Sequence, residues 1–297
     1  KSVSPKKPLF GLVMTDFSDS YGKELVASLE EASDNNCFLI LRRSIGIPER
    51  EDKIIQELVD FGVSGLIVFP AKARHYSSEI LKMVVNRFPL VLIDRSYKGV
   101  AAAAVSSDNV AAANKATNYL IDLGHENIGV FMPCNYETTT IQDRLLGIVE
   151  AFAEKQLIAN RELWCSDIKS TLPFPEASKR EDIEVIKENI KKNPKITALI
   201  TLEYSIALLA KIAIQELGMH VPRDISIICF DSPELSNQSW NFTHIKQDEK
   251  EIGRLAIKRL MEMYHGEFNI NSELVPAKLI EGNSTSRIKI KDGLLNK

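Results

Sequence analysis

The chain has 297 residues, of which 44% are hydrophobic and 26% are charged, and its formal net charge is -3. This length favours two α/β domains over one, and the composition excludes a disordered chain, because it is that of an ordinary globular protein. A negative net charge is the wrong sign for neutralising DNA phosphates. We therefore expect these residues alone to bind nucleic acid poorly.

The spacing of the cysteines and the lengths of the apolar runs indicate the cellular compartment of the protein. The four cysteines are scattered without C-x-x-C spacing, so we expect reduced thiols: Cys37, Cys134, Cys165 and Cys229. No apolar run approaches the roughly 20 residues that span a bilayer, and no apolar segment follows the basic N-terminal residues as in a signal peptide. These patterns favour a cytoplasmic protein with no membrane partner, although a signal peptide that had been removed would escape notice.

Short β-branched runs alternate with amphipathic segments along the first half of the chain, which predicts a parallel sheet with helical crossovers. We expect strands at 9–15, 37–41, 65–69 and 90–93. A helix follows the first strand, and two more lie near 50–61 and 78–88. A long Ala-rich helix then begins after Asp108, a helix-capping residue, and ends at Gly124, which suits a left-handed C-terminal cap.

The second half repeats the same rhythm. We expect strands at 128–132, 163–165, 198–201 and 225–230, with helices between them. A helix at 249–264 and an extended segment at 274–280 follow. Two similar α/β lobes are the predicted architecture.

Ligands of open parallel sheets sit beyond the carboxyl ends of the strands. Most of the residues at those places are polar, which makes their carboxylates candidate ligand contacts: Asp16, Asp19, Asp94, Glu203 and Asp231. Acids at strand ends are also common helix caps, and this alternative applies to all five.

Catalytic and cofactor motifs are missing. The sequence has no G-x-G-x-x-G, no phosphate-binding G-x-x-x-x-G-K-[ST] and no G-x-S-x-G, and its five histidines lie far apart without metal-site spacing. We therefore expect no catalytic residues, no cofactor, no metal and no enzyme activity.

Seven short segments, taken together and in order, resemble the LacI/GalR family of bacterial transcription regulators. They are LVLIDR (90–95), VSSDN (105–109), LGHENIGV (123–130), DRLLG (143–147), VPRDISIICFD (221–231), IKQ (245–247) and LIEGNST (279–285). The resemblance covers the chain from about residue 9 to residue 285. The chain departs from the family pattern at Leu202-Glu203-Tyr204, and at Cys229 and Phe230 before Asp231, which points to an unusual effector.

The resemblance implies a periplasmic-binding-protein-like type I fold with two Rossmann-like lobes of parallel sheets and three interlobe crossovers, near residues 106, 247 and 271. The implied N-terminal lobe comprises residues 9–106 and 248–271. The implied C-terminal lobe comprises residues 107–247 and 272–291. Residues 1–8 resemble a linker that follows a DNA-binding headpiece, and no headpiece occurs in the sequence.

The resemblance also implies the effector-contacting residues. Asp94, Arg144, Asp231 and Gln247 match family ligand positions, and Tyr21 matches an aromatic one, whereas Asp16 and Glu203 rest only on their places after strands. Other roles stay open. Arg144 could pair with a nearby surface carboxylate, Asp143 or Glu150, and Tyr21 could fill the core. For Arg144 and Asp231 we expect solvated side chains that add little to the stability of the unliganded protein.

The function implied by the resemblance is sensing without chemistry. A sugar-like effector would bind between the lobes and shift their closure, a homodimer would form, and operator DNA would be bound only through an N-terminal domain. The alternative is an extracytoplasmic sugar-binding protein of a transporter, which shares the two-lobe plan. Regulators pair whereas transport proteins of this kind are typically monomers, so the oligomeric state separates the two.

Overall fold

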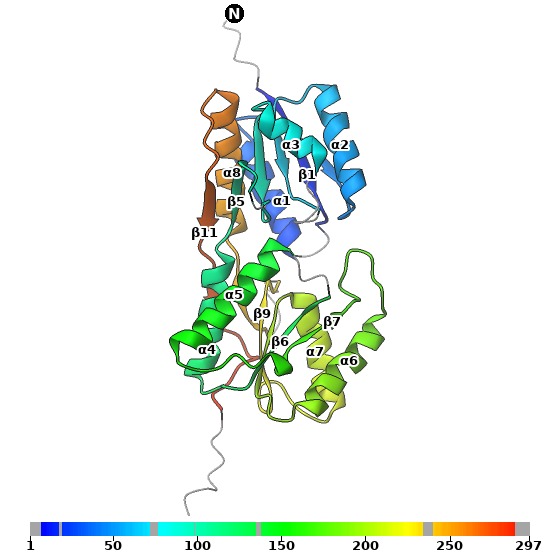
Figure 1. The fold of residues 1–297 in the computed structure, drawn as a ribbon, viewed down its shortest axis with the longest axis vertical. Helices are drawn as coiled ribbons and strands as arrows, with labels where there is room; N and C mark the ends of the chain where they lie inside the picture. The colour runs from blue at the N-terminus through cyan, green and yellow to red at the C-terminus, as the bar shows by residue number, and fades with distance from the viewer. Residues whose placement is uncertain are drawn as a thin grey trace, which may run out of the picture. The chain divides into compact units, whose positions relative to one another are not determined.

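The computed structural model describes residues 7–17, 20–71, 77–97, 99–134, 138–233 and 240–288. These residues form two units (Figure 1). Unit 1 holds the described residues of 7–108, 138–142 and 247–277, and unit 2 holds those of 109–134, 143–246 and 278–288. The predicted linker (1–8) lies mostly outside the described residues, as does Asp19.

The sheet of unit 1 has the strand order β11-β5-β4-β3-β1-β2, and all of its pairings are parallel. The central strands are buried on both faces, as their continuous apolar sequences require. The strands are β1 (Leu9–Met14), β2 (Phe38–Arg43), β3 (Leu66–Val68), β4 (Leu90–Ile93), β5 (Ala103–Ser107) and β11 (Ser272–Val275).

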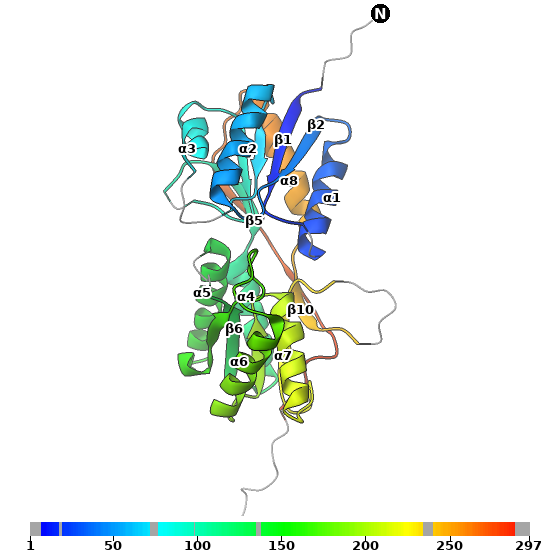
Figure 2. The same ribbon diagram turned by 90° about the vertical axis from the view of Figure 1, so that its right-hand side faces the viewer.

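Helices cover both faces of this sheet (Figure 2). On one face α1 (Ser20–Ser33) packs beside α8 (Glu249–Tyr264), and the core there includes Leu25, Leu29 and Ile252. On the other face α2 (Pro48–Phe61) and α3 (Ser78–Val85) bury a second set of apolar side chains. A helix from the last fifth of the chain therefore completes the core of unit 1.

The sheet of unit 2 has the order β12-β10-β9-β8-β6-β7, in which only β12 is antiparallel to its neighbour among the described strands. The strands are β6 (Ile128–Pro133), β7 (Cys165–Ile168), β8 (Ala198–Thr201), β9 (Ser226–Phe230), β10 (Thr243–Lys246) and β12 (Lys278–Ile280). The two sheets correspond strand for strand, so β4 and β9 occupy equivalent places.

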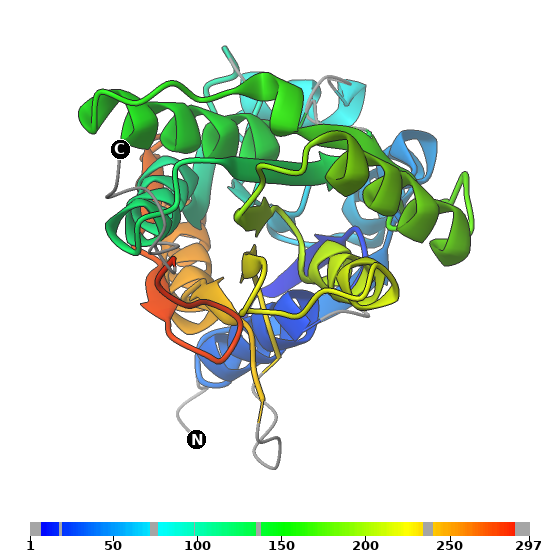
Figure 3. The ribbon, with the colours of Figure 1, turned by 90° about the horizontal axis from the view of Figure 1, so that it is seen from below.

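The helices of unit 2 again form two layers. One layer consists of α4 (Asn109–Asp122) and α5 (Thr139–Glu154). A short 3-10 helix, η1 (Arg161–Leu163), follows α5 in the chain. On the other face α6 (Lys179–Lys192) and α7 (Tyr204–Glu216) lie side by side and pack on the sheet (Figures 2 and 3). Local signals set the ends of these helices. Ser178 and Glu181 form a capping box on α6, and Gly124 beyond α4 adopts φ +95°.

The chain passes between the two sheets three times, after β5, after β10 and between β11 and β12. The predicted fold class, two lobes of parallel sheets with three crossovers, is confirmed. In the described part of the chain no helix is long and apolar enough to span a membrane. All four cysteines are free thiols, and Cys134 alone of them is not fully buried.

Two predicted details are wrong, and one strand was not predicted. The segment 274–280 is two strands in different sheets, because β11 pairs with β5 whereas β12 pairs with β10, so residues 272–277 belong to unit 1 and not to the second lobe. The strand predicted at 163–165 begins at Cys165, after η1. The apolar pattern also did not mark β10, which has only four residues and carries two polar side chains, Thr243 and His244, in the core.

Gly147 allows α5 to lie against α4. A Cβ built on Gly147 would lie 2.1 Å from Val110 O, too close for any side chain. Because the obstacle is helix backbone, it cannot move aside without displacing α4.

We therefore expect Gly147→Ala to lower the free energy of unfolding by about 1–3 kcal/mol, the usual cost of overpacking. Thermal unfolding followed by circular dichroism measures this. Leu146→Ala is the control, since Leu146 is 50% exposed on the same helix and its truncation should change the stability by no more than about 0.5 kcal/mol. Equal melting temperatures for Gly147→Ala and the wild type would contradict the close packing.

Candidate functional site

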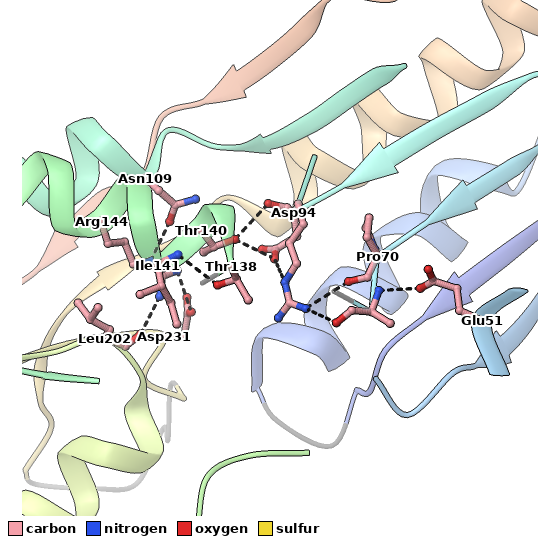
Figure 4. A network of polar contacts seen from close by, with 12 residues as sticks. Glu51, Pro70, Asp94, Asn109, Thr138, Thr140, Ile141, Arg144, Leu202 and Asp231 are labelled. Carbon is pink, nitrogen blue, oxygen red and sulfur yellow. Dashed lines mark hydrogen bonds and ion pairs between the residues drawn. The ribbon is translucent and has the colours of Figure 1, made fainter. Parts of the chain in front are cut away.

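Asp94 follows β4 in unit 1 and adopts φ +64°, in the left-handed region that few non-glycine residues occupy. Its backbone N–H donates to Val105 O of β5 at 3.0 Å. Thr140 Oγ1 donates to Asp94 O at 3.3 Å and to Asp94 Oδ2 at 3.4 Å (Figure 4). The carboxylate is thereby fixed beyond the end of its strand, with 7% of the residue exposed.

Asp231 occupies the equivalent place in unit 2. It follows β9, adopts φ +59°, and its N–H donates to Ile245 O of β10 at 3.0 Å. Its side chain is 20% exposed. In both units, therefore, a left-handed backbone conformation and a hydrogen bond to the neighbouring strand place a carboxylate at the end of the corresponding strand.

Arg144 lies beside Asp231 and is held from several sides (Figure 4). Its Nε donates to Asn109 Oδ1 at 2.8 Å and its Nη1 to Leu202 O at 2.7 Å. Its Nη2 lies 4.0 Å from Asp231 Oδ2, and its Cζ lies 3.8 Å from the centroid of the Phe230 ring. The guanidinium is therefore placed by an amide, a carbonyl, a carboxylate and an aromatic ring.

Arg95 makes a similar set of contacts in unit 1. Its Nε lies 3.7 Å from Asp94 Oδ2, and its Cζ lies 5.1 Å from the centroid of the Phe69 ring. Its Nη1 donates to Pro70 O at 3.2 Å and to Ala71 O at 3.0 Å. Each unit thus carries an aspartate in the left-handed conformation, with an arginine that stacks on a phenylalanine beside it.

Glu51 is linked to Arg95 of unit 1 through the backbone of Ala71. It lies in the first turn of α2 and is only 2% exposed. Its Oε2 accepts the N–H of Ala71 at 2.6 Å. Burial raises the pKa of Glu51 from its ordinary value to about 7, although the bond from Ala71, the charge of Arg95 and a hydrogen bond with Tyr97 act in the opposite direction. Burial likewise raises the pKa of Tyr97.

The other predicted residues fall in different surroundings. Gln247 is buried (2% exposed), directly after β10. Glu203 precedes α7 and makes no side-chain cap to that helix. Asp16 is exposed and pairs with Arg43 Nη1 at 3.1 Å.

Tyr21 packs in the apolar core of unit 1 with Leu25 and Leu29 and is 8% exposed. This position favours the alternative role of Tyr21, which is to fill the core, over the predicted ligand contact.

The carboxylate within ion-pair distance of Arg144 is Asp231, which is 87 positions distant in sequence. The expectation of a solvated side chain is wrong, because Arg144 is only 6% exposed. Sequence spacing could not show this, because the partners Asn109 and Leu202 come from two other elements.

Several residues of these clusters had no distinctive signal in the sequence. Glu51 looks like an ordinary acid in the first helical turn, where the helix dipole favours negative charge. Thr140 looks like a residue at a helix start, and Asn109 stood out only as the last residue of the VSSDN segment (105–109). In the described part of the chain, no group of three or more His, Cys, Asp or Glu side chains could hold a metal ion.

A family model described as "Periplasmic binding protein-like domain" matches residues 117–285. The ribose operon repressor of Haemophilus influenzae is 26% identical over 254 residues, which cover 85% of this chain and 73% of that protein. The arabinose metabolism transcriptional repressor of Geobacillus stearothermophilus is 27% identical over 292 residues, covering 94% of this chain and 77% of that protein. These relatives are named as repressors of transcription.

Solved structures share the fold. A LacI family transcriptional regulator from Enterococcus faecium with bound ribose has a TM-score of 0.76 at 21% identity, covering 95% of this chain and all of that one (100%). A dimeric Lac repressor with a C-terminal deletion has a TM-score of 0.75 at 20% identity, covering 94% and 100% of the two chains. At this level of identity the likeness establishes the fold alone.

The contacts of Arg144 predict a stability cost for its removal. Arg144→Ala leaves Asp231, Asn109 and Leu202 O without a buried cation, so we expect the free energy of unfolding to fall by about 3 kcal/mol. Chemical denaturation without ligand measures the change. Arg42→Ala is the control, because Arg42 pairs with Glu57 at 3.1 Å but is 46% exposed, and its loss should cost less than about 1 kcal/mol. Similar small losses in both variants would show that the Arg144 contacts are weak.

Proposed function

This chain belongs to the periplasmic-binding-protein-like domain family, and on that premise we propose that it is the effector-binding core of a LacI/GalR-type transcription regulator and senses a sugar or sugar derivative. The two relatives described above are named as repressors of a ribose operon and of arabinose metabolism. The observation that carries the proposal is the repeated group at the ends of β4 and β9, in which Asp94 lies beside Arg95 and Asp231 beside Arg144.

The chemistry of these groups suits a polyhydroxylated ligand. Vicinal hydroxyls donate and accept hydrogen bonds, so carboxylates can accept from them and an arginine can donate to them. We propose Asp94, Arg144 and Asp231 as the principal contacts, with Gln247, Glu203 and Asp16 around them. We do not include Tyr21 among the proposed contacts, because its ring packs in the apolar core of unit 1.

The proposed mechanism is a shift between conformations. An effector that contacts residues of both units favours one arrangement of those units over others, and it can shift the population only by its difference in affinity between them. We propose that this shift is passed to a DNA-binding headpiece outside these 297 residues, which binds the operator, and that the regulator acts in the cytoplasm.

The first test is sugar binding. D-ribose, L-arabinose, D-galactose and cellobiose are screened by thermal shift, where a ligand at 100 times its Kd should add about 2.7 kcal/mol of stability. Isothermal titration calorimetry then compares the wild type with Asp94→Asn and Asp231→Asn. Asparagine also tolerates the left-handed conformation, so each change removes mainly the charge. We expect each variant to bind about 10- to 100-fold more weakly, because hydrogen bonds to charged groups contribute about 1.5–3 kcal/mol.

Asp122→Asn is the matched control. Asp122 is the last residue of α4 and pairs with Lys155 on the surface. The affinity of the Asp122→Asn variant for the sugar should therefore equal that of the wild type. If Asp231→Asn alone weakens binding, the ligand is held by unit 2 only and the contact with both units is wrong. If neither aspartate variant changes the affinity, the site lies elsewhere.

We also propose that the chain acts as a homodimer and that α7 contributes to the interface. Leu208 and Ile212, one turn apart on α7, are each 41% exposed. Beside them Tyr204, Lys211 and Trp240 help to line a pocket of about 250 Å³, and Lys211 Nζ lies 3.4 Å from the centroid of the Trp240 ring. An exposed apolar helix face next to an aromatic pocket has the composition of an interface core.

Leu208→Asp should therefore convert the dimer to a monomer, because a carboxylate on an apolar interface loses its hydration. Sedimentation velocity measures the change. The control is Val85→Asp in α3 of unit 1, which is 81% exposed and should leave the dimer intact. A wild-type chain that is monomeric at high micromolar concentration would contradict the dimer and favour the transport-protein alternative.

A further inference from the structure

Two consecutive carboxylates at the start of α2 hold the end of β3 and the start of α3. Glu51 Oε2 accepts the N–H of Ala71, which follows β3, at 2.6 Å. Asp52 Oδ1 accepts the hydroxyl of Ser77, and Ser77 Oγ in turn accepts the N–H of Ile80 at 3.2 Å as the cap of α3. The N-terminal part of α2 thereby fixes two separate points of the chain.

The backbone at the end of β3 is held from both sides (Figure 4). Glu51 binds the N–H of Ala71, while Arg95 Nη1 donates to the carbonyls of Pro70 and Ala71 at 3.2 and 3.0 Å. The same Arg95 lies 3.7 Å from Asp94 Oδ2. A continuous path of contacts therefore runs from the buried Glu51 through Ala71 and Arg95 to the strand-end aspartate.

An ionised carboxylate is an expensive choice for this buried position. A glutamine of nearly the same shape could accept the N–H of Ala71 through its amide oxygen without losing the hydration of a charge. The groups that face Glu51 are Asp52 on its own helix, Arg95 and Tyr97 after β4, and the Ala71 backbone after β3. Among the described residues, Arg95 is the cation that lowers the pKa of Glu51, and its effect is smaller than that of burial.

We propose that Glu51 is a positioning residue of the unit 1 site, and that uptake of a proton by its carboxylate loosens Ala71 and Arg95 and weakens effector binding. This inference deepens the proposed function and rests on it. The ionised carboxylate accepts stronger, charge-assisted bonds from Ala71 and attracts Arg95, whereas the neutral acid does neither as well.

The pH range follows from the pKa of Glu51, which burial raises to about 7. Between about pH 6 and pH 8 the group therefore passes from mostly protonated to mostly ionised. Because this pKa is raised in the folded protein, the wild type takes up a proton on folding, and the stability that this confers is lost as the pH rises through about 7. The stability of Glu51→Gln relative to the wild type should accordingly increase with pH.

The test follows the backbone amides by nuclear magnetic resonance between pH 5.5 and pH 8.5. In the wild type, the amide shifts of Ala71 and Asp94 should titrate together with a midpoint near 7. In Glu51→Gln both should be flat across that range. The matched control is Glu57→Gln, an exposed acid of the same helix that pairs with Arg42, which should titrate like the wild type.

Calorimetry with D-ribose provides the second readout. We expect binding by the wild type and by Glu57→Gln to be at least about threefold weaker at pH 6 than at pH 8, and binding by Glu51→Gln to be equal at both. Persistence of the Ala71 and Asp94 titrations in Glu51→Gln, or their absence in the wild type, would overturn the inference. Equal D-ribose affinity at both pH values in the wild type would overturn it too.

The two proposals fail in different ways. If the four screened sugars do not bind but Ala71 and Asp94 titrate through Glu51, the positioning role is supported and the sugar-sensing function is wrong. If D-ribose binds and the amide shifts do not titrate, the function is supported and the role of Glu51 is wrong.

Discussion

Two backbone hydrogen bonds, one in each unit, hold the aspartates on which the two candidate groups depend. The N–H of Asp94 donates to Val105 O, and the N–H of Asp231 donates to Ile245 O. Each bond ties an aspartate with positive φ to the neighbouring strand. Because an L-residue keeps this conformation only where its surroundings determine it, the neighbouring strands β5 and β10 place the two carboxylates.

The arginines beside these aspartates belong to the fold as much as to the site. Arg144 is held by Asn109 and Leu202 O, and Arg95 by the carbonyls of Pro70 and Ala71. Side chains that are already ordered lose little freedom when a ligand arrives, which favours affinity. The same contacts make these arginines costly to alter, since each guanidinium also satisfies buried polar groups of its own unit.

The carboxylates of unit 1 differ in their surroundings. Asp94 lies next to Arg95 and accepts from Thr140, whereas Glu51 is farther inside, in the first turn of α2, and depends on Ala71 and Tyr97. Burial has a larger effect on the pKa of Glu51 than the charge of Arg95 and the hydrogen bond from Ala71, so the net shift is upward. Under the proposed role of Glu51, this carboxyl group would sense protons close to the candidate residue Asp94 without a histidine.

The sequence by itself determined the α/β class, most of the strands and the family resemblance, because apolar periodicity and short motifs are local properties. It also pointed to Asp94, Arg144 and Asp231 as candidates. Only the tertiary structure decided that Arg144 meets Asp231, that β11 and β12 join different sheets, and that Glu51 faces Ala71. These are contacts between segments distant in the chain, and the periodicity of one segment carries no information about which other segment will cover it.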